Sequence, residues 1–158
     1  MSKRSVLNIK FAPKRRVLFL LLLWPLAFLA AQGNADGVNP VSFISLTLDE
    51  LIKNFGVPRS VYAARGFEKW QDDVVFVYDE GDFYVFKNRV WQVGLKSFRG
   101  INVGDSRGVV SLVLGSKAED RPNAVFLPLT EAAWPMMLRC DFDNAGKVGD
   151  IFIYRTDF

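Results

Sequence analysis

The stretch that decides the fold is TLDELIKNFG, at positions 47–56. Thr47 is a favourable residue at the N-cap of a helix, and Glu50, three residues later, completes a capping box. One apolar face of this helix is formed by four residues at helical spacing, Leu48, Leu51, Ile52 and Phe55. Gly56 and Pro58 end the helix, because glycine favours the C-terminal turn and proline cannot continue it. The sequence therefore predicts a short amphipathic helix at the start of the folded domain.

Antiparallel hairpins are expected after this helix. Short runs rich in β-branched and aromatic residues alternate with turn residues, which is typical of such hairpins. The strands predicted in this part of the chain are 60–64, 74–78, 83–86 and 90–98.

The pattern starts again near residue 100. Residues 104–106 open a second predicted helix, which Gly115 ends. The apolar side of that helix is expected to contain Val109, Val110, Val113 and Leu114. A loop is predicted over 117–123, and the strands predicted after it are 124–129, 134–142 and 148–154.

The two halves of the chain look like an internal repeat. Segment 51–56 superposes on segment 110–115 with an offset of 59 residues. A single unit of about 55 residues buries little surface, whereas two units can share one core. We therefore predict an α+β fold of tandem helix–antiparallel meander repeats, 46–98 and 101–158. The repeats would form one sheet, with both helices packed on one face.

Several segments carry a resemblance to a known fold. They are FGVP at 55–58, GDS at 104–106, LG at 114–115 and FDNAGKV at 142–148. They resemble the repeat of the β-lactamase-inhibitor-protein fold, and they are similar to the small outer-membrane assembly lipoproteins of the SmpA/OmlA (BamE) type. The resemblance implies a protein-binding module with a curved sheet, and not an enzyme. The second unit departs from the pattern because no proline follows its LG pair, and the lipid-attachment cysteine of the lipoproteins is absent.

The first 35 residues have the layout of an export signal. A basic region over 1–16 precedes the apolar run VLFLLLLWPLAFLAA, Val17 to Ala31, and small residues follow. A run of this length suits a signal peptide, since spanning a bilayer takes about 20 residues. We expect cleavage after Ala35 or Gly33, which leaves a periplasmic or secreted protein. The alternative is an uncleaved signal anchor in the inner membrane.

The domain after the signal is expected to be mildly acidic. Residues 36–45 are predicted to be a linker, and residues 46–158 a single domain. Six of the 20 basic residues lie in the first 16 positions, where no acid occurs, so 14 basic and 17 acidic residues remain. No basic surface is left to suggest nucleic-acid binding. Cys140 is the single cysteine and lies in an apolar run, which indicates a buried thiol.

Chemical motifs are hard to find in this sequence. The chain has no histidine, which removes the commonest general base and the commonest zinc ligand. No glycine-rich phosphate loop is present. The acidic clusters at 79–82 and 141–146 are interpreted as hairpin turns rather than calcium sites. We therefore predict no catalytic residue, no cofactor and no metal. The alternative is an envelope hydrolase or ligand-binding enzyme that uses two close carboxylates in a pocket.

Aromatic residues offer the best candidates for a functional surface. Successive strand residues point to opposite faces, so Tyr84 lies opposite Phe83, and Trp91 is expected to share a face with Val93 and Leu95. If helices cover only one side of the sheet, some aromatic side chains lie on the open side, and exposed aromatic patches mark binding surfaces. The candidates for partner binding are Trp70, Tyr84, Phe86 and Trp134.

Together these features predict an exported, non-catalytic protein-interaction module of the cell envelope. We expect it to be a monomer that binds an envelope protein, and not nucleic acid, through an aromatic-rich sheet face.

Overall fold

The computed structural model describes residues 39–65 and 72–158. These residues belong to one compact unit, Val38–Phe158. The predicted export signal, 1–35, lies outside the described residues. In the part of the chain that is described, no helix is long and apolar enough to cross a membrane.

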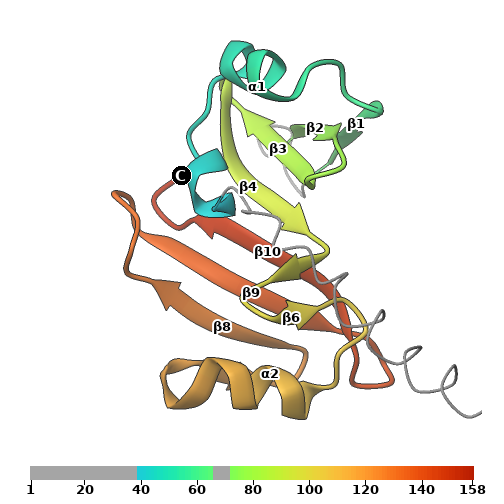
Figure 1. Ribbon diagram of the computed structural model, residues 1–158, viewed down its shortest axis with the longest axis vertical. Coiled ribbons are helices and arrows are strands. Elements are labelled where there is room, and N and C mark those ends of the chain that lie inside the picture. Colours follow the sequence, from blue (N-terminus) through green and yellow to red (C-terminus); the bar gives the residue numbers. More distant parts are fainter. Residues whose placement is uncertain (1–38, 66–71) are drawn as a thin grey trace, which may run out of the picture. The chain divides into compact units, whose positions relative to one another are not determined.

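An eight-stranded antiparallel sheet is the framework of the fold (Figure 1). Its strand order is β1-β2-β3-β4-β10-β9-β8-β7, so the two halves of the chain meet where β4 pairs with β10. The strands are β1 (Ser60–Ala64), β2 (Asp73–Val77), β3 (Asp82–Phe86), β4 (Arg89–Leu95), β7 (Glu119–Arg121), β8 (Ala124–Leu129), β9 (Met136–Phe142) and β10 (Val148–Arg155). A separate two-stranded ribbon contains β5 (Ser97–Phe98) and β6 (Ile101–Asn102).

Two helices and two short 3₁₀ segments complete the fold. The helices are α1 (Leu48–Phe55) and α2 (Arg107–Leu114), and the 3₁₀ segments are η1 (Pro40–Phe43) and η3 (Gly115–Lys117). Helix α1 precedes β1 to β4 in the chain, and α2 precedes β7 to β10. The fold is therefore α+β, as the sequence predicts.

The predicted capping box of α1 is confirmed. The Thr47 hydroxyl accepts a hydrogen bond from the backbone N–H of Glu50 at 3.2 Å, and the Glu50 carboxylate accepts one from the Thr47 N–H at 2.8 Å. The N-cap residue of α2, Ser106, makes no such side-chain bond. Both helices end at a glycine with positive φ, 76° at Gly56 and 67° at Gly115, a conformation that favours glycine.

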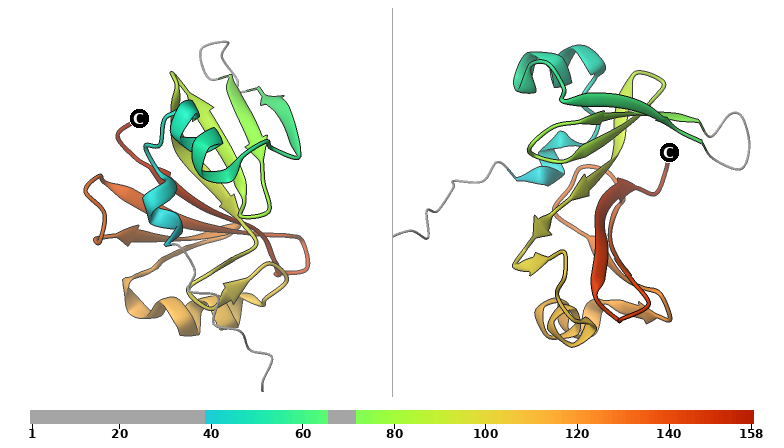
Figure 2. Two further views of the ribbon diagram at one scale, coloured as in Figure 1. Left: turned by 45° about the horizontal axis from the view of Figure 1, so that its top comes forward. Right: turned by 90° about the vertical axis from the view of Figure 1, so that its right-hand side faces the viewer.

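The hydrophobic core lies on one face of the sheet. Leu51 of α1 and Val110 of α2 are fully buried, and they belong to the same cluster as Phe83, Val93 and Ile153 from the strands. Both helices therefore pack on that face, and Figure 2 shows them on the same side of the sheet.

Aromatic rings fill the core next to α1. The ring centroids of Phe43 and Phe55 lie 5.2 Å apart, as do those of Phe55 and Phe83, and Tyr78 meets Phe83 edge-to-face at 5.5 Å. Phe43 comes from η1, inside the segment 36–45 that we expected to be a linker. Because its ring is buried in the core, the folded unit includes this part of the chain.

A β-bulge changes which side chains of β4 face the core. The pairing between β3 and β4 shifts between Tyr84 and Val85, so β4 contributes one extra residue there. Val90 consequently lies on the core side with Val93, both fully buried, while Trp91 lies on the opposite face. The expectation that Trp91 shares a face with Val93 is wrong, because strict alternation fails at a bulge.

The second half differs from expectation in two places. Val109 and Val113 of α2 are 39% and 43% exposed, so the buried side of this helix is narrower than its apolar pattern indicates. The predicted loop, 117–123, contains strand β7, which pairs with β8. The three residues of β7 are charged and exposed, so no apolar alternation in the sequence indicates this strand.

Cys140 is a buried thiol, as predicted. Its side chain is fully buried on the core side of β9. Burial raises the pKa of the thiol to about 11, with a smaller contribution from the neighbouring Asp141, so the sulfur stays protonated at neutral pH.

Candidate functional site

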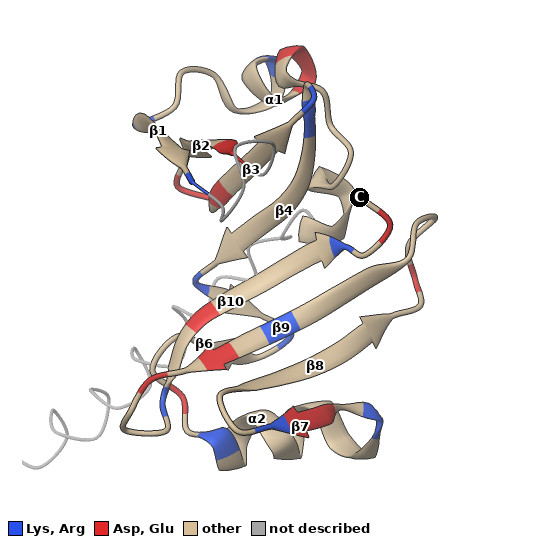
Figure 3. Cartoon of the chain, turned by 180° about the vertical axis from the view of Figure 1, so that it is seen from behind, with Lys and Arg blue, Asp and Glu red and all other residues tan. Residues whose placement is uncertain are grey.

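The sheet face opposite α1 and α2 presents a set of aromatic side chains. We call this set the aromatic face; it consists of Tyr62, Tyr84, Trp91, Phe126, Phe152 and Tyr154. Figure 3 views the molecule from this side, and the right-hand view of Figure 2 shows that the sheet bends with this face on the inner side of the bend. A bent sheet with aromatic side chains on its inner side can enclose a convex partner surface.

Cross-strand register decides which of these residues are neighbours. Tyr84, Gln92 and Tyr154 lie side by side on adjacent strands. Val75, in β2, is opposite both Tyr62 and Tyr84. Val75 is fully buried and Gln92 is only 8% exposed, although both lie outside the main core. The aromatic face is therefore packed at its base, which holds its rings in place.

The rings also contact one another across the strands. Tyr84 meets Phe152 edge-to-face at 6.1 Å, and Trp91 meets Tyr154 edge-to-face at 6.4 Å. The indole N–H of Trp91 donates a hydrogen bond to the Asp73 carboxylate at 3.1 Å. Such pairs limit the motion of rings that remain partly exposed.

Arginine side chains lie over three of these rings, those of Phe126, Phe152 and, at 6.0 Å from the Arg139 guanidinium, Tyr154. The Arg139 guanidinium is 4.8 Å from the centre of the Phe152 ring, and it pairs with Asp141 at 3.0 Å. Arg121 lies 4.6 Å from the centre of the Phe126 ring, and it pairs with Glu119. Both arginines are therefore neutralised by an acid of the same face, and they contribute little net charge.

Three other acids of this face have no ion pair within the described residues: Asp73, Asp82 and Asp150. Burial raises the pKa of Asp73 and of Asp82 above the ordinary value, with smaller opposing effects from the Trp91 hydrogen bond and from Lys96, respectively. Desolvation of these carboxylates is unfavourable for the charged form, so a cationic partner would stabilise it. The face consequently has an excess of unpaired negative charge.

A pocket opens on this face where β3, β4 and β10 meet. Its volume is about 320 Å³, and its lining includes Asp82, Tyr84, Gly94, Asp150 and Phe152. A side chain at Gly94 would place its Cβ 3.4 Å from the Phe152 ring and 3.5 Å from the Asp82 Cβ. The missing side chain at this position therefore keeps the space between aromatic ring and carboxylate open.

A second hollow, of about 740 Å³, lies beside α2. Arg107 is part of its lining, and its guanidinium pairs with Asp120, lies 4.2 Å from the centre of the Phe142 ring, and donates to the Arg121 carbonyl at 2.9 Å. These contacts attach α2 to β7 and β9. They hold the Arg107 guanidinium in place through three hydrogen bonds, to Asp120, Arg121 and Pro122, so we assign this hollow a structural role.

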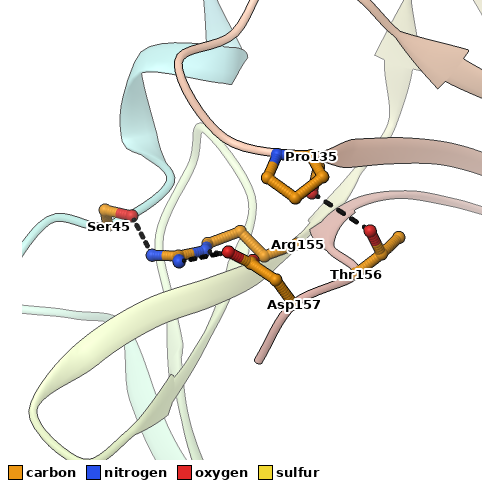
Figure 4. Close-up of polar contacts among 5 residues, drawn as sticks. All are labelled: Ser45, Pro135, Arg155, Thr156 and Asp157. Atoms are coloured by element: carbon orange, nitrogen blue, oxygen red, sulfur yellow. Dashed lines mark hydrogen bonds and ion pairs between the residues drawn. The ribbon is translucent and has the colours of Figure 1, made fainter.

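The residues after β10 are held at one end of the aromatic face (Figure 4). Arg155 donates two hydrogen bonds to the Asp157 carboxylate, both at 2.9 Å, and a third to the Ser45 hydroxyl at 2.9 Å. The Phe158 ring then stacks on Trp91, with 6.4 Å between centroids and 8° between planes. The hydrogen bonds of Arg155 and the stacking on Trp91 thus add the Phe158 ring to this end of the aromatic face.

The sequence-predicted candidates have different places in the structure. Tyr84 lies within the aromatic face, and Phe86 lies at its end, 6.1 Å from the Phe158 ring. Trp134 lies outside the sheet, between β8 and β9, and it is 46% exposed under the Arg155 guanidinium. Trp70 lies outside the described residues.

Sequence reasoning missed several residues of this face. Phe152 and Tyr154 alternate with buried isoleucines in β10, so strand periodicity was a sufficient signal for them. Arg139 alternates with buried residues in β9 in the same way. Trp91 could not be found by periodicity, because the bulge reverses its face.

Metal binding has no support in the described part of the chain, where no group of three histidine, cysteine or acidic side chains is arranged to hold an ion. The carboxylates of Asp82 and Asp150 do share a pocket. This is the feature that the alternative of a carboxylate enzyme requires.

Comparisons with known proteins add little to this picture. No protein-family model and no curated protein matches the chain. Among solved structures, the chain is similar to an extracellular protein containing a SCP domain from Bacillus anthracis str. Ames, with 13% identity and a TM-score of 0.48. The match covers 76% of this chain and 46% of that protein, so the chain spans less than half of its length. The expected resemblance to β-lactamase-inhibitor protein and to the SmpA/OmlA lipoproteins is corrected by this result, since the matching structure is a SCP-domain protein.

Proposed function

We propose that this protein is an exported, non-catalytic interaction module that binds another protein through its aromatic face. The observation that carries the proposal is the set of partly exposed rings on the sheet side opposite α1 and α2, the two helices of the described residues. Tyrosine and tryptophan contribute much of the binding energy in protein interfaces, and rigid rings lose little entropy on binding. The packed base under Tyr84 supports a surface that is organised before the partner arrives.

The charge of the face favours one kind of partner. Asp73, Asp82 and Asp150 are without ion pairs in the described residues, and the two arginines of the face are already paired. Complementary charge steers association and selects the correct partner. The proposed partner is therefore a protein surface that presents basic side chains among apolar ones.

Export is part of the same proposal and rests on the leader, 1–35. The sequence of basic, apolar and small residues supports a cleaved signal. Determining the N-terminus of the protein recovered from the cell envelope tests it. A start at or near Asp36 supports cleavage, and a start at Met1 or Ser2 would instead indicate an anchor formed by Val17 to Ala31.

Site-specific crosslinking tests the binding face. A photoreactive amino acid at Tyr84 should crosslink one partner in the native envelope, whereas the same group at Val57, which is 91% exposed between α1 and β1, should not. The purified partner should then bind the wild-type protein and lose at least tenfold in affinity with Phe152→Ala. Equal crosslinking from both positions, or unchanged affinity of the variant, would refute the proposal.

One observation favours a second candidate function. Asp82 and Asp150 line the same pocket, and burial raises the pKa of Asp82, as in general acids of carboxylate enzymes. A hydrolase of this kind would lose turnover with both Asp82→Asn and Asp150→Asn. A binding module shows no turnover in the wild type, so a screen of envelope glycans and esters separates the two candidates.

We also propose that segments 46–98 and 101–158 are two copies of one unit. Support comes from equivalent features at nearly constant offsets. Isolated bridges pair Thr47 with Arg89 and Ser106 with Lys147, at offsets of 59 and 58 residues. The costs of Gly56→Ala and Gly115→Ala, compared by urea unfolding, test this equivalence.

A further inference from the structure

We propose that the pocket between β3, β4 and β10 is an anchor site for a cationic side chain, an arginine or a lysine, of the bound protein. This inference rests on the proposed function, because it names the group of the partner that enters the aromatic face. The pocket has the shape, the charge and the aromatic walls that such a side chain requires.

The shape of the pocket suits a single side chain. Its volume of about 320 Å³ is at the lower end of the range for ligand sites. Gly94 helps to keep it open, because a Cβ there would lie 3.4 Å from the Phe152 ring and 3.5 Å from the Asp82 Cβ. At Gly81 a Cβ would lie only 2.4 Å from the Gly94 carbonyl oxygen, so the absence of a side chain lets the two backbone segments approach closely. The pocket is therefore a hollow in the sheet face that a larger residue at Gly94 would narrow.

The charged groups of the pocket are Asp82, Asp150, Lys96 and Arg59. Arg59 forms an ion pair with Asp79, so its charge is compensated outside the pocket lining. Neither pocket carboxylate has an ion pair or a side-chain hydrogen bond to another described residue, and Lys96 alone opposes them. The remaining negative charge favours a cation over an anion.

The walls of the pocket add a second attraction for a cation. Tyr84 and Phe152 are among its lining residues, and a cation near the face of an aromatic ring is stabilised by the charge distribution of the ring. Arg139 already uses Phe152 in this way, at 4.8 Å from the ring centre. Burial raises the pKa of Tyr84 to about 12, so the phenol stays neutral and keeps its proton at physiological pH.

A pair of probes of the same shape tests the charge preference. We would titrate the protein, purified from cells that express the full chain, with N-acetyl-arginine methyl ester and with the citrulline analogue, which replaces the guanidinium by a neutral urea. Backbone amide signals of Gly81 and Gly94 report on the pocket in NMR spectra. The arginine probe should shift these signals in a saturable way, and the citrulline probe should bind at least tenfold more weakly.

Charge variants locate the site. Asp82→Asn and Asp150→Asn should each weaken arginine binding by about fivefold or more, and the NMR spectrum of each variant reports whether it is folded. Glu80→Gln changes the net charge equally at an exposed position outside the pocket lining, so it should leave binding unchanged. Raising the salt concentration should weaken binding of the arginine probe, because salt screens the attraction.

Several outcomes would overturn the proposal: equal binding of both probes, equal loss in Glu80→Gln, or no shift at Gly81 and Gly94. The proposed function is tested separately by crosslinking from Tyr84. If a partner is captured there and the arginine probe does not bind, the anchor site is wrong and the interaction face stands. If the probe binds and no partner crosslinks, the protein-binding function fails and the cation site stands.

Discussion

Replacing Leu51 by alanine tests the assignment of the helix side as the buried side of the sheet. Leu51 is the one residue of α1 that is fully buried, and it belongs to the aromatic part of the core with Phe43 and Phe83. Leucine-to-alanine changes at such sites cost about 3–5 kcal/mol, which combines lost burial with the cavity that remains. The stiff rings and the paired strands around this site limit collapse, so we expect a value of at least about 3 kcal/mol.

The expected loss is large enough to measure in two ways. For a domain of this length, about 3 kcal/mol corresponds to a fall in Tm of roughly 10–15 °C. Urea unfolding followed by tryptophan fluorescence gives the free energy directly, since Trp91 and Trp134 lie in the folded unit. Leu112→Ala is the matched control in α2, where the side chain is 83% exposed, and it should change stability by less than about 0.5 kcal/mol.

A small effect would refute this reasoning. If Leu51→Ala costs less than about 1 kcal/mol, α1 is not packed on the sheet through this residue. The helix side of the sheet would then not be the core side, and the aromatic face on the opposite side would no longer be the open face.

Three further predictions concern single features of the fold. The pKa of Glu50 is lowered from 4.5 first by the hydrogen bond from the Thr47 backbone N–H and second by the one from the Thr47 hydroxyl, and Thr47→Ala removes only the second. The wild type therefore gains stability from the hydroxyl bond above pH 4.5 and loses it as the pH falls through the lowered value. Urea unfolding should show a larger difference between wild type and variant at pH 7 than at pH 3, and an equal difference contradicts the capping role. Gly56→Ala and Gly115→Ala should each cost about 1–3 kcal/mol through backbone strain, because φ is positive at both positions. A Cβ at either position meets no atom within 4 Å, so no steric clash adds to this cost. Costs that differ by more than about 1 kcal/mol in urea unfolding would argue against equivalent units. Cys140 should resist a thiol reagent at pH 8 in the native protein and react once urea unfolds it; rapid native modification would show that it is not buried.

Local interactions explain what the sequence predicted well. The capping box of Thr47 and Glu50 lies within four residues, so no distant part of the chain can change it. The hairpins and the buried thiol followed in the same way from turn residues and apolar alternation. Strand 60–64 and strand 124–129 were predicted with the bounds that the structure has, because each lies between clear turn signals.

The candidate binding face was predicted only in part, for reasons that lie in its neighbours. Tyr84 was identified because β3 alternates regularly between Phe83 and Val85. The reversal at Trp91 depends on a bulge whose cause is the pairing with another strand. Trp134 was predicted as a binding residue at the start of strand 134–142, but the structure begins this strand at Met136 and places Trp134 outside the sheet.

The sequence by itself therefore determined the elements: two helices that each end at a glycine, short antiparallel strands, an α+β class and a leader separate in composition from the domain. Only the tertiary structure decided that β4 pairs with β10, and this pairing places Phe152 beside Gly94 and opens a pocket between Asp82 and Asp150. The physical reason is distance along the chain. Caps, turns and alternation depend on residues a few positions apart, whereas this pocket depends on strands more than 50 residues apart that meet only when the core forms.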